Sequence, residues 1–346
     1  MESKSGKKLY ITALNVVSCL AVVLMHTSSF WSFNKYRTWI FANLTESVCY
    51  FAVPVFLMIS GATLMDFGKK YSLKEYFKKR IGKTVIPFVF WSLFAIGFTI
   101  WQNRRGTYDL SPTAIIDSVI NNKYIAIYYF FIILFGVYLS IPVLAAIDES
   151  KRKKVFGYII IAAFTVNSLL PFLCSLTGGR INANSNFSFF ACAGYLIFPV
   201  IGYCLDRCEL SAKQRAAVYI AGAAGLLIHF FGTWYMSYQD NAINKLFKGY
   251  LNVPSVLYAA AIFLLFRRIP FECFPSAVKK AIGFFGGQTF GIYLIHLFIM
   301  MIVENNFRIT FVGAPARWCY ALAVFAVSGL IVKLLQLIPV VRRTVP

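Results

Sequence analysis

The chain has 346 residues, of which 59% are hydrophobic and only 14% are charged. This composition excludes an ordinary soluble domain, in which about 25% of residues are charged. The net charge of +21 would suggest nucleic-acid binding in a soluble protein, but here the basic residues lie between long apolar runs. We therefore expect them to set membrane topology and to meet membrane lipids or an anionic substrate, with no nucleic acid as partner.

Ten apolar runs of roughly membrane-spanning length follow one another along the chain. No stretch between them is long enough for a soluble domain. The pattern predicts a single all-α, polytopic membrane domain over residues 1–346, with about ten transmembrane helices and no extra soluble domain. The runs cover residues 10–31, 45–66, 84–103, 124–146, 155–175, 189–206, 215–237, 248–267, 281–302 and 317–341.

Basic residues gather on one side of these runs. When the runs alternate across the membrane, the N-terminal lysines and the basic stretches at 69–83 and 151–154 fall on the same side. The positive-inside rule then predicts that both termini are cytoplasmic. The first run lacks an obvious cleavage site and is long, so we expect a retained helix rather than a signal peptide.

The first run contains His26 in an otherwise almost wholly apolar stretch. An ionisable side chain inside a membrane is costly and usually has a function. Asn15 lies on the same helix face, about 16 Å away along the axis. A polar stripe of this kind faces the interior of a helix bundle. The alternative is that His26 only forms a hydrogen bond with a neighbouring helix.

His296 lies in the ninth run, at about the same depth as His26. Two imidazoles at equal depth can meet and take part in proton transfer. For His296, too, a purely structural hydrogen bond remains an alternative. The third histidine, His229, has no recognisable context and is interpreted as structural.

Glu46 stands near the start of the second run, on the outer side and near the depth of His26. A carboxylate there could orient the imidazole and stabilise its charged form. Alternatively, Glu46 is an acidic residue in the first turn of a helix, where the helix dipole favours it.

The first inner loop is strongly basic. Lys79, Arg80 and Lys83 recur at helical spacing and could form one cationic face. Such a face suits the phosphates of a nucleotide. The alternative is that these residues only anchor the loop at the inner membrane surface.

The second run combines Pro54 with Ser60 and Gly61. Pro54 predicts a kink, and the small Ser60–Gly61 pair predicts close approach of a second helix. A kinked helix here would shape a cavity. Eight cysteines lie mostly within apolar runs and no CxxC occurs, so we expect no metal site.

Taken together, these features resemble the integral-membrane acyltransferase family 3 over nearly the whole chain. The resemblance rests on His26, the segment 53–61, the basic loop that ends at Pro87, and the segment 287–296 that ends in His296. The first helix of the family usually carries an arginine, ten further residues and then the histidine. In this chain Asn15 occupies the arginine position.

The resemblance implies an O-acetyltransferase type of enzyme in the cell envelope, in a multi-pass protein of the bacterial plasma membrane. It would move an acyl group, commonly acetyl, from cytoplasmic acyl-CoA to a hydroxyl of a cell-surface polysaccharide or its lipid-linked precursor. Lys79, Arg80 and Lys83 would then hold the CoA phosphates, while the pantetheine arm follows the Asn15 face.

In such an enzyme His26 would take the proton of the acceptor hydroxyl, or would itself carry the acyl group. Tyr293, Ser60 or His296 would donate to the oxyanion. Two other classes of protein fit the buried polar residues: a glycan or lipid flippase, and a proton-coupled transporter that uses both histidines. Neither of these consumes acyl-CoA.

Overall fold

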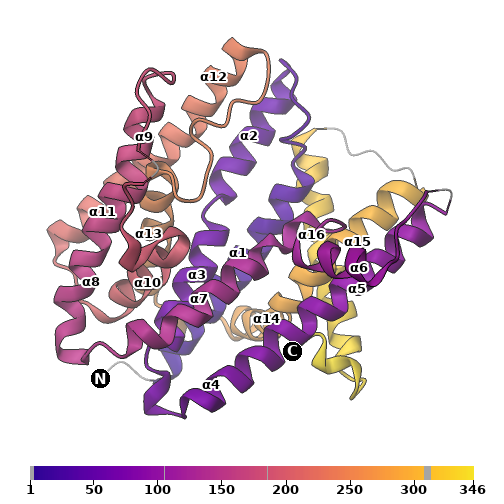
Figure 1. Cartoon of the computed structure of the whole chain (residues 1–346), viewed down its shortest axis with the longest axis horizontal. Helices are drawn as coiled ribbons and strands as arrows, with labels where there is room; N and C mark the ends of the chain where they lie inside the picture. Colours follow the sequence, from indigo (N-terminus) through magenta and orange to yellow (C-terminus); the bar gives the residue numbers. More distant parts are fainter. Residues whose placement is uncertain (1–3, 105, 185, 308–312) are drawn as a thin grey trace.

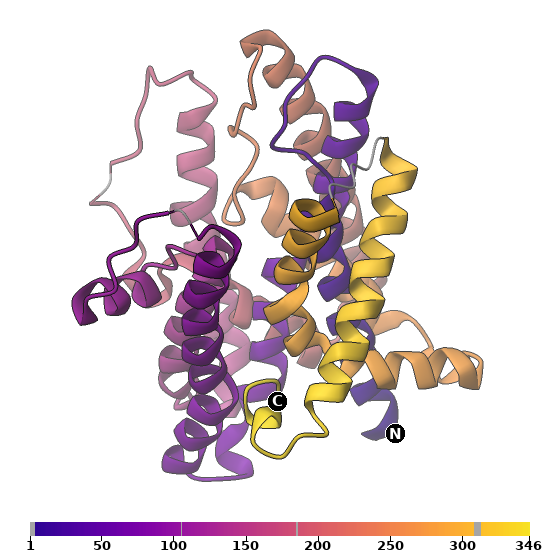
Figure 2. The same cartoon turned by 90° about the vertical axis from the view of Figure 1, so that its right-hand side faces the viewer.

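The computed structural model describes residues 4–104, 106–184, 186–307 and 313–346, and this part of the chain contains helices and no strands. The predicted all-α architecture is confirmed. The start of α1 and the C-terminal segment lie at one end of the bundle, here called the termini end (Figures 1 and 2). The α-helices are α1 Lys4–Thr27, α2 Arg37–Cys49, α3 Ala52–Leu64, α4 Leu73–Arg80, α5 Ile86–Gln102, α6 Pro112–Ile120, α7 Tyr129–Ala145, α8 Glu149–Ala163, α9 Leu170–Ser175, α10 Ile197–Arg207, α11 Ala212–Leu227, α12 Thr233–Asp240, α13 Val253–Arg268, α14 Ser276–Gly286, α15 Thr289–Phe307 and α16 Ala314–Leu335.

Three π-helical turns join shorter helices into continuous rods. They connect α4 to α5, α8 to α9 and α11 to α12, at Ile81–Val85, Phe164–Leu169 and Ile228–Gly232. Eight helical segments in the described residues are then long and apolar enough to cross a membrane, as expected for a polytopic membrane protein. They are Leu9–Thr27, Arg37–Lys69, Leu73–Gln102, Ala126–Ala145, Glu149–Ser175, Ala212–Asp240, Thr289–Phe307 and Ala314–Leu335.

Two of the ten apolar runs form helices that are shorter than these eight. The run 189–206 yields α10 with 11 residues, and the run 248–267 yields α13 with 16 residues. Gly194 interrupts the first of them with a positive φ of 55°, a conformation that only glycine adopts readily. Almost every residue of α10 is buried, and the helix packs against α3, α8 and α13. It therefore owes its apolar sequence to the interior of the bundle.

The predicted kink in the second run lies between α2 and α3, at Tyr50 and Phe51. Pro54 has no backbone N–H, and its ring excludes the carbonyl of the residue four positions earlier, Tyr50. The structure ends α2 at Cys49 and resumes the helix at Ala52, so the kink lies where the proline requires it.

The ninth run is not one helix, contrary to the prediction. It divides at Gly287 and Gln288 into α14, which lies across the bundle near the termini (Figure 2), and α15, which enters the bundle. Gly286 and Gly287 are poor helix formers. In addition, a Cβ at Gly286 would overlap the side chain of Thr12, so α14 can pack against α1 only through a glycine.

A buried ionic network ties several helices together at the termini end. The Asp66 carboxylate, which follows α3, accepts from Arg152 Nη1 at 2.8 Å and from Arg207 Nη2 at 2.6 Å. Arg152 also donates to the carbonyls of Ile147 and Ala145, at 2.8 Å and 2.5 Å. The carboxylate thus joins α3 to α8 and α10, because each arginine comes from a different helix.

Asp66→Asn is expected to lower the free energy of unfolding by about 3 kcal/mol, because it leaves the Arg152 guanidinium buried without its counter-charge. The side chains of Arg152 and Asp66 are only 9% and 11% exposed. Thermal unfolding of the detergent-solubilised protein measures the change. Glu149→Gln is the control, since its ion pair with Lys69 is more than half exposed and should contribute less than about 1 kcal/mol. Equal losses from both variants would contradict the assignment.

Candidate functional site

The two histidines that the sequence singled out meet in the bundle. His26 lies one residue before the end of α1, and His296 lies within α15. Their ring centroids are 5.3 Å apart and the ring planes are inclined by 36°. The inference from equal depth is therefore confirmed as far as their proximity is concerned. The side chain of His26 is exposed, whereas that of His296 is fully buried.

The hydrogen bonds of His296 indicate its tautomer. Its Nδ1 lies 3.0 Å from the Ile292 carbonyl and 2.9 Å from the Tyr293 carbonyl. Two carbonyl acceptors require a proton on Nδ1, so Nε2 of the neutral ring is an acceptor. This Nε2 is buried without a hydrogen-bond partner among the described residues. A buried nitrogen with a free lone pair is available to take or share a proton.

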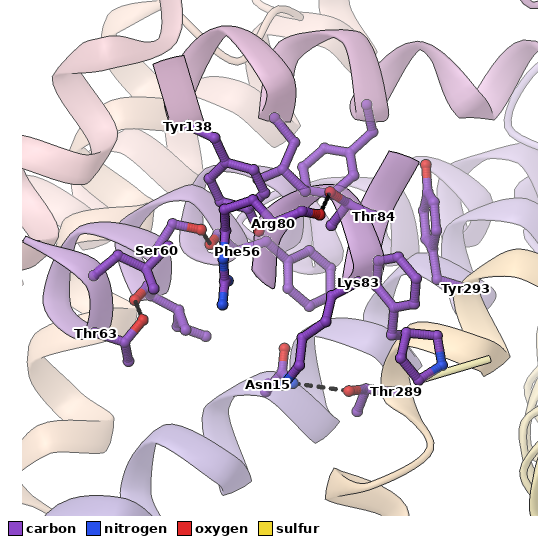
Figure 3. A pocket seen from close by; sticks show the side chains of 16 residues that line it. Asn15, Phe56, Ser60, Thr63, Arg80, Lys83, Thr84, Tyr138, Thr289 and Tyr293 are labelled. Carbon is purple, nitrogen blue, oxygen red and sulfur yellow. Dashed lines mark hydrogen bonds between the residues drawn. The ribbon is translucent and has the colours of Figure 1, made fainter. Parts of the chain in front are cut away.

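A cavity of about 270 Å³ lies nearer the termini end, with Asn15 of α1 at its border (Figure 3). Asn15 Nδ2 donates to Thr289 Oγ1 at 2.8 Å, which fixes the start of α15 against α1. We refer to this space as the inner cavity. It is lined by Asn15, Phe56, Ile59, Ser60, Thr63, Leu64, Arg80, Lys83, Thr84, Phe130, Leu134, Tyr138, Thr289, Phe290, Tyr293 and Pro346.

Two of the three predicted cations line the inner cavity. Arg80 and Lys83 do so, and the Arg80 guanidinium lies 5.5 Å from the ring centroid of Tyr138. Lys79 does not, because neighbouring helical residues point about 100° apart. Its Nζ lies 3.9 Å from the ring centroid of Tyr71. The expectation of one common cationic face was therefore wrong for Lys79.

The π-helical turn Ile81–Val85 shapes this wall of the inner cavity. Within it, Thr84 Oγ1 donates to the Arg80 carbonyl at 2.6 Å. Turns of this kind often occur at functional sites because they widen the helix locally and redirect side chains. No sequence pattern predicts this π-helical turn.

The hydroxyls that the sequence suggested as oxyanion donors are already engaged. Tyr293 donates to the Ile127 carbonyl, and Ser60 donates to the Phe56 carbonyl at 3.2 Å. Both side chains line the inner cavity. Either hydroxyl would have to exchange its carbonyl partner for a ligand before it could stabilise an oxyanion.

Tyr293 connects the inner cavity to the histidine pair. It lines the cavity, and its ring centroid lies 6.0 Å from that of His296. The site is therefore arranged in order along α1. The cations of the inner cavity lie nearest the termini end, Tyr293 follows, and the two histidines lie toward the far end of α1. This order is what a reagent entering from one side and a partner arriving from the other would require.

Glu46 does not open a helix. It lies in α2, which begins at Arg37 and ends at Cys49, so Glu46 belongs to the last turn rather than the first. The helix dipole disfavours a carboxylate at this position. The side chain is 5% exposed, and its Oε2 has no hydrogen-bond partner in the described part of the chain. The explanation by a favourable dipole is excluded.

The positive charge that acts on Glu46 is that of Lys248, which lowers the energy of the carboxylate through space but forms no ion pair with it among the described residues. Lys248 Nζ lies 4.2 Å from the ring centroid of Phe30 and 5.2 Å from that of Tyr50, and it makes no hydrogen bond to a described residue. His229 stacks on the same tyrosine with centroids 4.5 Å apart. Buried charges without direct partners are expensive in a membrane bundle and typically mark functional sites. No hydrogen bond joins Glu46 to His26 in the described residues.

Sequence reasoning missed several of these residues. Lys248 stands at the start of the run 248–267, and no pattern in the sequence connects it with Glu46. Thr289 lies inside the segment that resembles the family motif, yet its bond to Asn15 needs the folded chain. Tyr138 carries no signal beyond its place in an apolar run.

The described residues contain no group of three or more histidine, cysteine, aspartate or glutamate side chains arranged to hold a metal ion.

The chain was compared with protein-family models, curated proteins and solved structures. A family model described as "Acyltransferase domain" matches residues 8–333. No curated protein and no solved structure matches the chain. The matched range includes both histidines and the whole basic wall of the inner cavity.

Proposed function

Since the chain belongs to the acyltransferase family 3 and is a membrane acyltransferase, we propose that it transfers an acetyl-type acyl group from acyl-CoA to a hydroxyl of a cell-surface or lipid-linked glycan. The charge pattern favours a cytoplasmic position for the termini end, and the membrane in this proposal is a bacterial plasma membrane. Acyl-CoA then enters from the side of the inner cavity, and the acceptor approaches from the side of His26.

The observation that carries the proposal is the position of Tyr293. It borders the inner cavity, and its ring centroid lies 6.0 Å from that of His296, whose ring in turn lies beside that of His26. A thioester at the end of the pantetheine arm would reach the histidine pair by passing this tyrosine. The Arg80 and Lys83 cations at the wall would meanwhile attract the anionic part of CoA.

His26 acts as the general base in this proposal. It accepts the proton of the acceptor hydroxyl, whose oxygen attacks the thioester carbonyl carbon. The C–S bond breaks, and the CoA thiolate leaves with the proton that His26 returns. His296, neutral and with Nε2 free, shares the proton transiently, since two imidazolium ions at this separation would repel each other.

Free CoA release tests the proposal. Purified protein in lipid nanodiscs should release CoA from acetyl-CoA only when a glycan acceptor is present, with the acetyl ester found on the glycan by mass spectrometry. Movement of intact glycan or protons without consumption of acetyl-CoA would instead identify a flippase or a transporter. Labelled acetyl trapped on His26 in the absence of acceptor would show a covalent route in place of direct transfer.

Arg80→Gln and Lys83→Gln are each expected to raise the KM for acyl-CoA about 10-fold, because each removes a charge-assisted contact to an anion. The value of kcat should change much less, since neither residue lies at the histidine pair. The control is Lys154→Gln, which removes one exposed charge from the predicted cytoplasmic start of α8. A rise in KM of the same size in the control would show a general effect of charge.

A further inference from the structure

A second and larger cavity lies beside the inner cavity. Its volume is about 1130 Å³, and it separates α4 and the following π-helical turn from the C-terminal segment. Four cationic side chains border it, and its remaining lining is mainly apolar. We call it the basic groove; its lining is Lys74, Phe77, Lys78, Ile81, Gly82, Ile86, Gln336, Arg342, Arg343, Val345 and Pro346.

The two arginines are held in place by a firmly packed segment. Trp91 Nε1 donates to the Thr344 carbonyl at 2.9 Å, and Gln336 Nε2 donates to the Val345 carbonyl at 3.0 Å. Thr344 and Val345 are buried, while the adjacent Arg342 and Arg343 are exposed. Because the backbone directly after the arginines is fixed by these bonds, a ligand that binds there has to order the two side chains but not the segment that carries them.

None of the four cations forms an ion pair within the described residues. The salt bridges of this face use other side chains, namely Asp66, Asp206, Glu149 and Glu209 with their partners. Glu75 is adjacent to Lys74 in sequence but does not line the groove. Four unpaired positive charges around one concave surface attract an anion with several charges.

The inner cavity is too small for a whole CoA molecule. Its 270 Å³ falls below the ~300–1,000 Å³ of pockets that enclose a drug-sized ligand, and CoA is larger than such a ligand. The inner cavity can therefore hold the pantetheine arm at most. Pro346 lines both the inner cavity and the basic groove, so a ligand that leaves one meets the other.

We propose that the basic groove binds the nucleotide end of CoA, with its 3′-phosphate and the adenosine side of its diphosphate on Lys74, Lys78, Arg342 and Arg343, while Arg80 and Lys83 of the inner cavity meet the diphosphate where the pantetheine arm begins. This rests on the proposed function. The adenine lies against the apolar part of the lining, which includes Phe77 and Ile81. Arg342 and Arg343 lie beyond the residues 8–333 that the family model matches.

Kinetics with two donors test the groove. The double variant R342Q/R343Q should raise the KM for acetyl-CoA at least 10-fold and leave kcat unchanged. With S-acetylpantetheine, which lacks the nucleotide, variant and wild type should have the same kcat/KM. The matched control K153Q/K154Q removes two exposed charges from α8 and should behave as wild type with both donors.

A direct binding measurement distinguishes a failure of the groove proposal from a failure of the proposed function. Adenosine 3′,5′-diphosphate should bind the wild type and bind R342Q/R343Q at least 10-fold more weakly in calorimetry. If the wild type did not turn over acetyl-CoA, the proposed function would fail, and this binding measurement would still decide the groove. Equal binding by wild type and variant would overturn the proposal.

An anionic lipid headgroup carries the same phosphate chemistry and is the alternative occupant. The variants are therefore compared in nanodiscs of phosphatidylcholine alone and of phosphatidylcholine with phosphatidylglycerol. A KM effect that is the same in both lipids supports nucleotide binding. An effect seen only with phosphatidylglycerol, with unchanged binding of the diphosphate, assigns the groove to lipid and overturns the proposal.

Discussion

Replacing His26 by alanine is expected to lower kcat for acyl transfer by about 10²–10⁴-fold, which is the usual contribution of a positioned general base. The residue does not line the inner cavity. CoA binding should therefore remain within about twofold of the wild type, and an intact binding isotherm would also show that the variant folds. The rate is measured as acceptor-dependent release of free CoA in nanodiscs.

Two further variants separate the base from the shape of the side chain. His26→Gln keeps a polar side chain of similar size but supplies no basic nitrogen, so its rate should stay as low as that of the alanine variant. Because His26 is exposed, imidazole added to His26→Ala should restore part of the activity. Full activity of either variant without imidazole would refute the assignment of His26.

His296 is expected to matter through a different property. Its Nδ1 proton is committed to the Ile292 and Tyr293 carbonyls, which leaves Nε2 as the free position. A side chain at this place helps by sharing the proton of His26 and by fixing its ring. Removal of the His296 imidazole should therefore lower kcat less than removal of the His26 imidazole. Added imidazole should not restore the activity, since the side chain of His296 is fully buried.

The proximity of the two histidines could be predicted because it depends mainly on one quantity, the depth of each residue in the membrane. Counting residues from the inner side of a membrane helix gives depth at a fixed rise per residue, and both histidines came out at the same depth. The counting worked for His296 even though its run begins with a separate helix, α14. The reason is that α1 and α15, which carry the two histidines, run in the same direction through the bundle.

The cationic wall was only partly predictable because it depends on rotation about a helix axis. The regular spacing grouped Lys79 with Arg80 and Lys83. A π-helical turn intervenes at Ile81–Val85, and Lys79 already points to Tyr71. No feature of the local sequence reports this turn, so the orientation of neighbouring cations could not be derived from the pattern.

The influence of Lys248 on Glu46 could not be predicted from the sequence, for a different reason. Lys248 is about two hundred positions away in sequence, and its charge acts on Glu46 because the segment before α13 places Lys248 over the rings of Phe30 and Tyr50. Contacts of this length follow from tertiary packing and not from periodicity. The start of α2 was misplaced as well, since Arg37–Thr45 continues the helix with a mixture of polar and apolar residues that reads as a loop.

The close helix approach predicted at Ser60–Gly61 is the most demanding contact of the fold, and Gly61→Leu is expected to abolish folding. A Cβ on Gly61 would overlap the carbonyl oxygen of Pro199, and one on Gly202 would overlap that of Met58. Each helix therefore presses a glycine against the backbone of the other. Because backbone cannot rotate away as a side chain can, α3 and α10 would have to separate.

The expected loss is at least ~5 kcal/mol, beyond the usual range for point substitutions and comparable with the whole stability of a typical domain. Ala at either position already introduces the overlapping atom, so Gly61→Ala and Gly202→Ala should both unfold at lower temperature than the wild type. Size-exclusion profiles and thermal unfolding in detergent measure the effect. The double variant should lose less than the sum, because both clashes are relieved by one separation of the helices.

Gly136 provides the matched control. It is exposed within α7, and a Cβ there meets no atom within 4 Å. Gly136→Ala should leave stability unchanged or raise it by about 0.5–1 kcal/mol, because alanine is the better helix former. If Gly61→Ala were as stable as Gly136→Ala, then α3 and α10 would not be in backbone contact. The position of Ser60 and Phe56 at the inner cavity, which depends on that contact, would have to be revised.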